Sequence, residues 1–246
     1  MGEGPPLIIL HGVFGSADNW QSLGKEFAKS FTTYLVDQRN HGLSFHSDEF
    51  NYEVMTEDLY ALCEAEGLDH IHLVGHSMGG KTAMYFACKH TEIVDKLVVV
   101  DIAPKSYPPH HQQIFAGFQS VNLDQIQSRK EADELMAAEI DNIGVRQFIL
   151  KNLKRNADKW EWKLNLQAIK QNATQIGQAL PTGFTFEKDT LFIGGGNSDY
   201  IREEDKDLIR HHFSNADVKM IPGAGHWVHA EKPVELKLMV SEFLSD

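Results

Sequence analysis

The first stretch of the chain that could do chemistry is VGHSMGG, residues 74–80. It sets Ser77 between Gly75 and Gly79, a Gly-x-Ser-x-Gly pattern that average glycine and serine usage would produce by chance in roughly one chain of this length in ten. A serine hydroxyl is a poor nucleophile unless a base takes its proton. The pattern therefore indicates a nucleophile only if the chain also supplies a base, an acid behind the base, and donors for an oxyanion.

The base that the sequence offers is His226, in the segment GAGHWVHAEKP. It follows the last predicted strand, and the chain order of serine, acid and histidine is the one expected for a serine held at a strand-to-helix turn. His229 lies at the predicted start of the last helix, where we expect a structural role. Two aspartates could orient the base, because Asp101 ends LVVVD and Asp199 lies in GGGNSDY. Spacing alone leaves both open.

An oxyanion hole needs two backbone N–H groups aimed at the developing negative charge. One is expected from Met78, at the N-terminus of the helix that follows Ser77, where N–H groups lack partners within the helix. The second is expected from Val13 in the loop HGVFGS, with Phe14 as the alternative. Phe14, His76 and Trp227 are the residues we expect to line a substrate pocket.

No metal or cofactor is expected. The pairs His110–His111 and His211–His212 lack metal-ligand spacing, and we expect them to be exposed. The sequence has no H-E-x-x-H motif. GGGN, residues 194–197, lacks the spacing of a dinucleotide-binding loop. Trp160 and Trp162 are expected to pack within their own segment.

These residues need a scaffold that brings distant segments together. Apolar strands are predicted at residues 7–12, 32–37, 70–75 and 96–103, and they alternate with helices at 16–31, 53–67 and 78–90, which favours a doubly wound, mostly parallel α/β sheet. From about 104 to 181 the pattern predicts helices and no strand, and the alternation resumes at 190–196. We therefore predict one core from residues 1–104 and 186–246, with residues 105–185 inserted as a helical cap, or lid.

Composition narrows the class of protein. The chain has 246 residues, 42% of them hydrophobic, and a formal charge of −12 without a Lys/Arg-rich block, so nucleic acid is not an expected partner. Its two cysteines, Cys63 and Cys88, favour a reducing compartment over a disulfide scaffold, and we expect a cytoplasmic protein. No signal peptide or apolar run long enough to insert into a membrane is evident.

Six stretches together carry a family resemblance: HGVFGSADNW, VDQRNHGLS, VGHSMGGK, KLVVVDIAP, GGNS and GAGHWVHAEKP. With them the chain resembles the α/β-hydrolase-fold serine esterases of the bacterial YbfF type. The resemblance implies hydrolysis of short-chain esters and acyl thioesters without a cofactor. It also favours Asp101 over Asp199, because that family places its acid at the end of the strand after the serine. One departure is that about ten residues precede Gly12, so the N-terminal edge strands of such folds are expected to be missing.

The leading hypothesis is a carboxylesterase or acyl thioesterase with a Ser77–His226–Asp101 triad, acting on a small-molecule ester or acyl-CoA through an acyl-enzyme on Ser77. The cap would roof the site and set the acyl-chain length. A cofactor-free acyltransferase or perhydrolase with the same triad is the first alternative. The second, less favoured, is a ligand-binding protein that keeps the hydrolase shell without catalysis.

Overall fold

A six-stranded parallel sheet forms the centre of the computed structural model, which describes residues 1–109, 111–157 and 159–245. The strand order is β2-β1-β3-β4-β7-β8, and every neighbouring pair is parallel. Edge strand β2 has no antiparallel neighbour in the described chain, as the sequence predicted. The strands are β1 (Pro6–Leu10), β2 (Thr32–Val36), β3 (Ile71–His76), β4 (Val94–Val100), β7 (Thr190–Gly195) and β8 (Ala216–Ile221).

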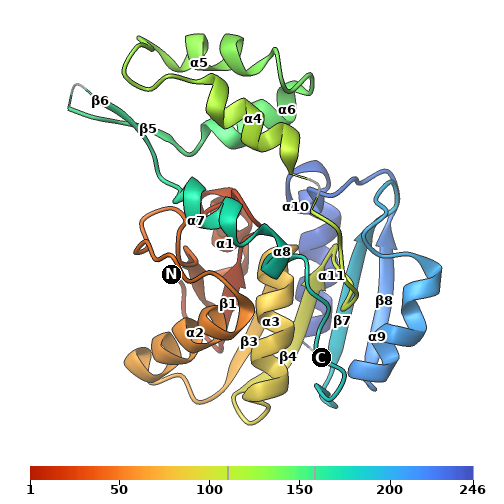
Figure 1. Ribbon diagram of the computed structural model, residues 1–246. Helices are drawn as coiled ribbons and strands as arrows, with labels where there is room; N and C mark the ends of the chain where they lie inside the picture. Colours follow the sequence, from red (N-terminus) through yellow and green to blue (C-terminus); the bar gives the residue numbers. More distant parts are fainter. Residues whose placement is uncertain (110, 158, 246) are drawn as a thin grey trace.

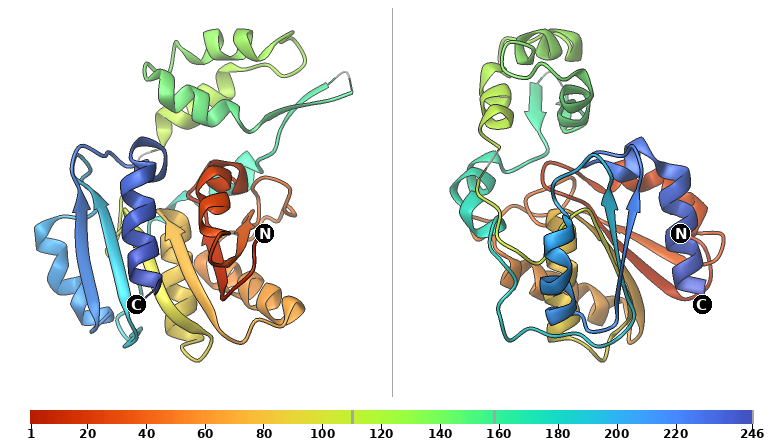
Figure 2. Two further views of the ribbon diagram at one scale, coloured as in Figure 1. Left: turned by 180° about the vertical axis from the view of Figure 1, so that it is seen from behind. Right: turned by 90° about the vertical axis from the view of Figure 1, so that its right-hand side faces the viewer.

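Helices cover both faces of this sheet (Figure 2). Successive side chains of a strand point to opposite faces, so Leu7 and Ile9 pack with the helices α1 and α11, whereas Ile8 and Leu10 pack with α2 and α3. This burial on two sides explains why the strands are continuously apolar. The core helices are η1 (Ala17–Trp20), α1 (Gln21–Phe27), α2 (Tyr52–Glu66), α3 (Met78–Lys89), η2 (Glu203–Asp205), α9 (Lys206–His212), α10 (Val228–Glu231) and α11 (Pro233–Ser245).

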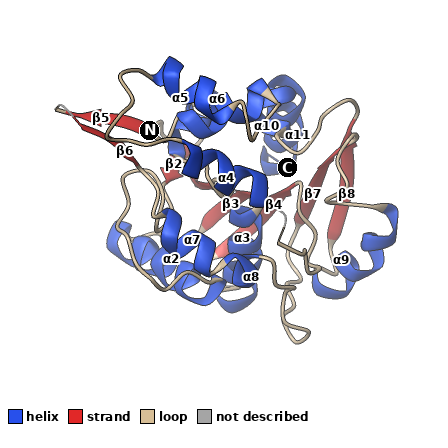
Figure 3. Cartoon of the chain, turned by 45° about the horizontal axis from the view of Figure 1, so that its top comes forward, coloured by secondary structure: helices blue, strands red, loops and turns tan. Residues whose placement is uncertain are grey.

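Between β4 and β7 the chain leaves the sheet and builds a lobe above the carboxyl ends of the strands, which we call the cap lobe (Figures 1 and 3). Its helices are short. The first three pack on one another, whereas the last two are also hydrogen-bonded to core residues Asn40, Asp48 and Tyr52. The elements of the cap lobe are α4 (Gln112–Ser120), α5 (Arg129–Met136), α6 (Ile143–Leu150), β5 (Leu153–Asn156), β6 (Lys159–Trp162), α7 (Leu166–Gln171) and α8 (Ala173–Ile176).

The hairpin of β5 and β6 corrects the sequence prediction, which had no strand in this lobe. The two strands are antiparallel, with Leu153 opposite Trp162 and Arg155 opposite Trp160. The guanidinium of Arg155 lies 5.7 Å from the Trp160 ring centre, and the Trp162 ring meets Phe118 edge-on. The tryptophans at i and i+2 therefore share one face of a strand. A segment this short does not distinguish that period from a helical one.

Three smaller observations concern other sequence predictions. His211 is exposed as expected, but His212 is buried and its Nδ1 lies 2.7 Å from the carbonyl oxygen of Phe184, whereas His110 falls outside the described residues. Cys63 and Cys88 are free thiols. Within the described chain, no helix combines the length and the apolar character that crossing a membrane requires.

The helix α3 carries a lysine inside the core. Lys81 is 1% exposed, and burial, assisted by the nearby charge of Lys105, lowers its pKa from 10.5 to about 7. Lys105 is itself paired with Asp205, and the ring of Tyr107 faces the Lys81 ammonium at 5.4 Å. Below a pH of about 7 the buried lysine is charged and its desolvation cost is complete, and above 10.5 it is neutral in both the folded and the unfolded state.

We therefore expect the contribution of Lys81 to stability to rise with pH across this window. The free energy of unfolding of the wild type relative to Lys81→Met should increase between about pH 7 and about pH 9, because the unfolded lysine still binds a proton that the folded one releases. Urea titrations of both proteins at both pH values measure this difference. A difference that stays flat or falls would contradict the burial of this side chain.

Candidate active site

The site lies where the strand order reverses. The chain goes from β1 outward to β2 on one side, and β3 takes the place on the other side of β1. Loops that follow β1 and β3 therefore diverge to opposite faces and leave a crevice at the carboxyl edge, which is where open α/β sheets bind ligands. The loop with Val13 follows β1, and Ser77 follows β3.

Ser77 sits in a sharp turn between β3 and α3, with φ 52° and ψ −117°. A non-glycine residue at positive φ is uncommon, and here the turn lifts the side chain above the sheet edge. The two flanking glycines are required by space. A Cβ on Gly75 would lie 2.2 Å from the carbonyl oxygen of Gly79, and one on Gly79 would lie 2.5 Å from the carbonyl oxygens of Leu10 and His11. The pattern around Ser77 thus reflects how closely α3 approaches β1 and β3.

Replacing Gly79 by alanine should destabilise the fold. The new methyl group meets backbone atoms that cannot rotate away, so we expect a loss of about 1–3 kcal/mol or more in the free energy of unfolding. Gly183→Ala is the matched control, because its Cβ would meet nothing within 4 Å. Urea unfolding of both variants measures the effect, and equal stability of the two would contradict this account of the turn.

Ser77, His226 and Asp101 form one hydrogen-bonded chain. His226 Nδ1–H donates to Asp101 Oδ2 at 2.8 Å, and His226 Nε2 lies 3.1 Å from Ser77 Oγ. A carboxylate behind Nδ1 keeps the proton on that nitrogen, so Nε2 presents its lone pair to the serine hydroxyl. The Asp101 side chain is fully buried, whereas that of His226 is 20% exposed. The arrangement can draw a proton from Ser77 Oγ.

The structure places the two candidate acids very differently. Asp101, with φ 50° directly after β4, also accepts from the Gly195 N–H at 2.8 Å and from the Ser198 hydroxyl at 2.6 Å. The segment GGGNS, which follows from β7, therefore supplies donors to this carboxylate. The Asp199 side chain is 89% exposed and pairs with Arg202 at 3.5 Å. Of the two, Asp101 is the one that contacts His226.

Ring contacts lead from His226 through His76 and His229 to Trp20. His76 Nε2–H donates to the carbonyl oxygen of His226 at 2.8 Å, and the His229 ring stacks on Trp20 with a centroid distance of 4.7 Å. Burial lowers the pKa of His229 to about 3 and holds the pKa of His76 well below its usual range. Both imidazoles are therefore neutral near pH 7 and add no positive charge beside His226. His229 lies in α10, a helix separate from α11, and its buried ring also lines one end of the cavity over Ser77.

The two residues expected to supply the oxyanion donors, Val13 and Met78, both line a smaller cavity beside Ser77. No acceptor within the described residues takes the backbone N–H of Val13 or of Met78. Phe14, the alternative to Val13, donates its N–H to His41 Nε2 at 3.2 Å, so that group is already engaged. The backbone N–H groups of Val13 and Met78, the pair expected from the sequence, are therefore the ones available to bind an oxyanion.

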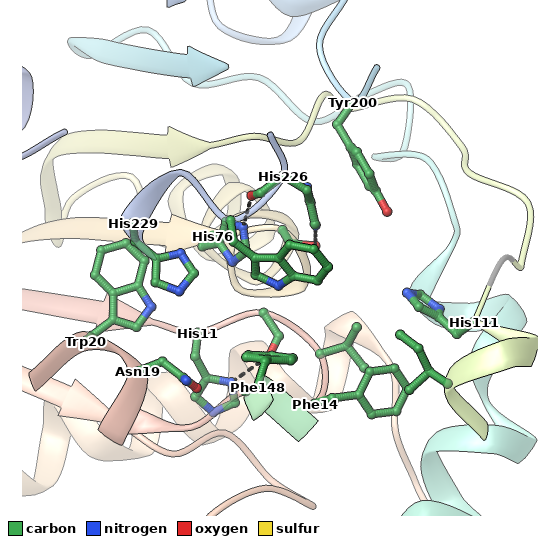
Figure 4. A pocket seen from close by; sticks show the side chains of 16 residues that line it. His11, Phe14, Asn19, Trp20, His76, His111, Phe148, Tyr200, His226 and His229 are labelled. Atoms are coloured by element: carbon green, nitrogen blue, oxygen red, sulfur yellow. Dashed lines mark hydrogen bonds between the residues drawn. The ribbon is translucent and has the colours of Figure 1, made fainter. Parts of the chain in front are cut away.

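A cavity of about 220 Å³ opens over Ser77 (Figure 4). Phe14, His76 and Trp227, the predicted pocket residues, all line it. Figure 4 shows Trp20 and His229 at one end and Phe14 and His111 at the other. A smaller cavity of about 30 Å³ lies on the Met78 side of the serine.

Sequence reasoning missed several lining residues, among them Tyr200, His111, Phe148 and Asn19. Tyr200 stacks on the His226 ring with a centroid distance of 3.8 Å and an interplanar angle of 17°. Its place after GGNS was the available signal. His111 was expected to face solvent, but it lines the cavity with Phe148 from the cap lobe and Asn19 from η1. Nothing in the periodicity of the cap lobe marks which of its residues face the sheet.

Comparisons of the sequence and of the structure with known proteins all find hydrolases of one fold. The chain matches the profile of the family described as "alpha/beta hydrolase fold" over residues 5–233. It is 38% identical to the sn-1-specific diacylglycerol lipase ABHD11 of Mus musculus, covering 98% of this chain and 81% of that protein, and 36% identical to Esterase YbfF of Escherichia coli K12, covering 98% and 93%. A solved structure described as "Marine microorganism esterase" superposes with a TM-score of 0.96 at 41% identity, covering 98% and 96%.

Proposed function

Because this chain belongs to the alpha/beta hydrolase fold family and is an ester hydrolase of that class, we propose that it cleaves carboxylic esters and acyl thioesters through an acyl-enzyme on Ser77. The observation that carries the proposal is the hydrogen-bonded chain from Ser77 Oγ through His226 to the buried Asp101. An aspartate in place of Ser77 would indicate a different reaction on this fold.

The proposed first step joins Ser77 Oγ to the acyl carbon of the substrate. The hydroxyl proton passes to His226 Nε2 as the bond forms, and the negative oxygen that results accepts from the N–H groups of Val13 and Met78. Asp101 remains ionised and stabilises the imidazolium. When the tetrahedral intermediate collapses, His226 returns the proton to the leaving alcohol or thiol.

A water molecule completes the reaction. His226 takes a proton from that water, whose oxygen attacks the acyl carbon, and the imidazolium then protonates Ser77 Oγ as the carboxylic acid leaves. No metal or cofactor takes part in this scheme. The cap lobe, residues 105–185, acts as a lid in the proposal, because His111 and Phe148 bring its side chains to the cavity over Ser77. Small acyl groups suit the narrow cavity beside Met78.

Covalent labelling tests the proposal directly. A fluorophosphonate should bond to one residue, and mass spectrometry of the digested protein should find the added mass on the peptide that contains Ser77. The labelled protein should lose hydrolysis of nitrophenyl acetate and of acetyl-CoA in proportion. A label elsewhere, or full activity after labelling, would overturn the proposal. Added alcohol that diverts the acyl group into a new ester would favour the acyltransferase alternative.

A further inference from the structure

Lys81, the last residue of the VGHSMGGK stretch, has no part in the chemistry described so far. Its Nζ donates to the carbonyl oxygens of Lys105 and Gln178, both at 2.6 Å. Among the described residues, no carboxylate lies within ion-pair distance of it. A buried cation without a counter-ion is costly, and the hydrogen bonds to these two carbonyl oxygens are the polar contacts that its ammonium makes inside the fold.

The two carbonyls belong to the two connections between the sheet and the cap lobe. Residues 101–109 lead out of β4, and residues 177–189 lead back to β7; both run beside α3 (Figure 1). The connections are also bonded to each other, since the Tyr107 N–H donates to Gly177 O at 2.7 Å and the Leu180 N–H donates to Pro104 O at 2.8 Å. Lys81 adds hydrogen bonds from α3, the helix that follows Ser77, to both connections.

A chain of contacts leads from these connections to His226. The Tyr107 hydroxyl accepts from the Ala103 N–H at 2.9 Å and donates to the carbonyl oxygen of Tyr200 at 2.6 Å. The rings of Tyr107 and Tyr200 stack with centroids 5.2 Å apart. Tyr200 in turn stacks closely on the ring of His226. The position of the base is therefore linked to the outgoing connection by side-chain contacts.

We propose that Lys81 is a positioning residue: it ties the two connections of the cap lobe to α3 and thereby holds, through Tyr107 and Tyr200, the ring of His226 in reach of Ser77 Oγ. This inference rests on the proposed function, because it assigns importance to the place of His226. A displacement of about 1 Å at a reacting group can lower a rate about a hundredfold, so a clamp outside the pocket can matter for kcat.

The clamp does not depend on the charge of Lys81. A neutral amine retains two N–H donors, enough for the carbonyl oxygens of Lys105 and Gln178. Other core side chains contact this region too, since the Tyr85 hydroxyl lies 3.4 Å from Ala179 O in the returning connection and the Tyr52 hydroxyl donates to Ile176 O, at the end of α8 just before it, at 2.6 Å. Lys81 differs from these two tyrosines in bonding both connections at once.

The test compares Lys81→Met with Tyr85→Phe. Methionine keeps the length and the apolar stem of lysine but removes the donors, whereas Tyr85→Phe removes a hydroxyl from the same helix that contacts the returning connection alone. Rates are expressed per active site titrated with a fluorophosphonate, well below the melting temperature of each variant. We expect Lys81→Met to lower kcat by about tenfold or more with little change in KM, and Tyr85→Phe to leave kcat within about twofold.

A double-mutant cycle separates positioning from loss of stability. Tyr200→Leu should also lower kcat, and Lys81→Met combined with Tyr200→Leu should lower it by less than the product of the two single effects, since both act on the same ring. Multiplicative effects, or an unchanged kcat in Lys81→Met, would overturn the proposal. If Lys81→Met does not fold, Tyr107→Phe breaks the same path without touching the cation, and an unchanged kcat there would overturn it equally.

The proposed function can fail separately. In that case the fluorophosphonate does not label Ser77 in the wild type and no active sites can be titrated. Limited proteolysis still tests the clamp, because Lys81→Met should then be cut faster within residues 101–109 and 177–189 than the wild type or Tyr85→Phe. Equal cleavage of the three proteins would overturn the clamp itself.

Discussion

Ser77→Ala lowers kcat for ester hydrolysis by about 10⁴-fold or more, because no other group then forms the covalent bond to the acyl carbon. The loss is expected in kcat, since the cavity that binds the substrate keeps its lining. Alanine removes a single oxygen and leaves the backbone of the turn in place, so the melting temperature should change little. Release of nitrophenol from nitrophenyl acetate measures the rate.

Ser245→Ala is the control for this substitution. Ser245 ends α11, is exposed, and donates its hydroxyl to Ser241 O at 2.8 Å, far along the chain from the cavity. Its variant should hydrolyse the ester at the wild-type rate. If wild type and Ser77→Ala both hydrolyse the ester only at the background rate, the protein is not an esterase. That result would favour the second alternative, a ligand-binding protein that keeps the hydrolase shell.

Asp101→Asn should reduce kcat by about 10⁴-fold, whereas Asp199→Asn should leave it within about twofold. The asparagine amide would present N–H donors where Asp101 now accepts from Gly195, Ser198 and His226. To pair with it, the imidazole would have to turn its unprotonated nitrogen toward the amide, which puts the proton on Nε2 and removes the acceptor for the Ser77 hydroxyl.

The Asp199 variant is the matched control for this second prediction. Both changes replace a carboxylate by an amide near the carboxyl ends of the strands, but Asp199 is exposed and contacts Arg202 rather than His226. Steady-state kinetics of the two variants with one ester decide between them. Loss of activity in Asp199→Asn with a fully active Asp101→Asn would reverse the assignment.

Much of the scaffold was predictable because its signals are local. Continuous apolar runs marked the strands, and the residues around Ser77 marked the turn that follows β3. The mostly parallel sheet, the inserted helices and the family resemblance are confirmed. The β5–β6 hairpin was not predicted, because the alternation of Trp160 and Trp162 spans too few residues to separate a strand from a helix.

The sequence by itself determined which residue types could act and the order in which they follow one another: a serine at a strand-to-helix turn, a histidine after the last strand, and two aspartates at strand ends. Tertiary structure alone showed that Asp101 is buried against His226 and the GGGNS loop while Asp199 is exposed, because both follow strands and only packing separates them. That Asp101 is the catalytic acid stays a prediction. It also decided the stack of Tyr200 on His226 and the bonds of Lys81 to the cap connections. These contacts join segments about 25 to 150 residues apart, and hydrophobic periodicity reports only on neighbours within a turn or a strand.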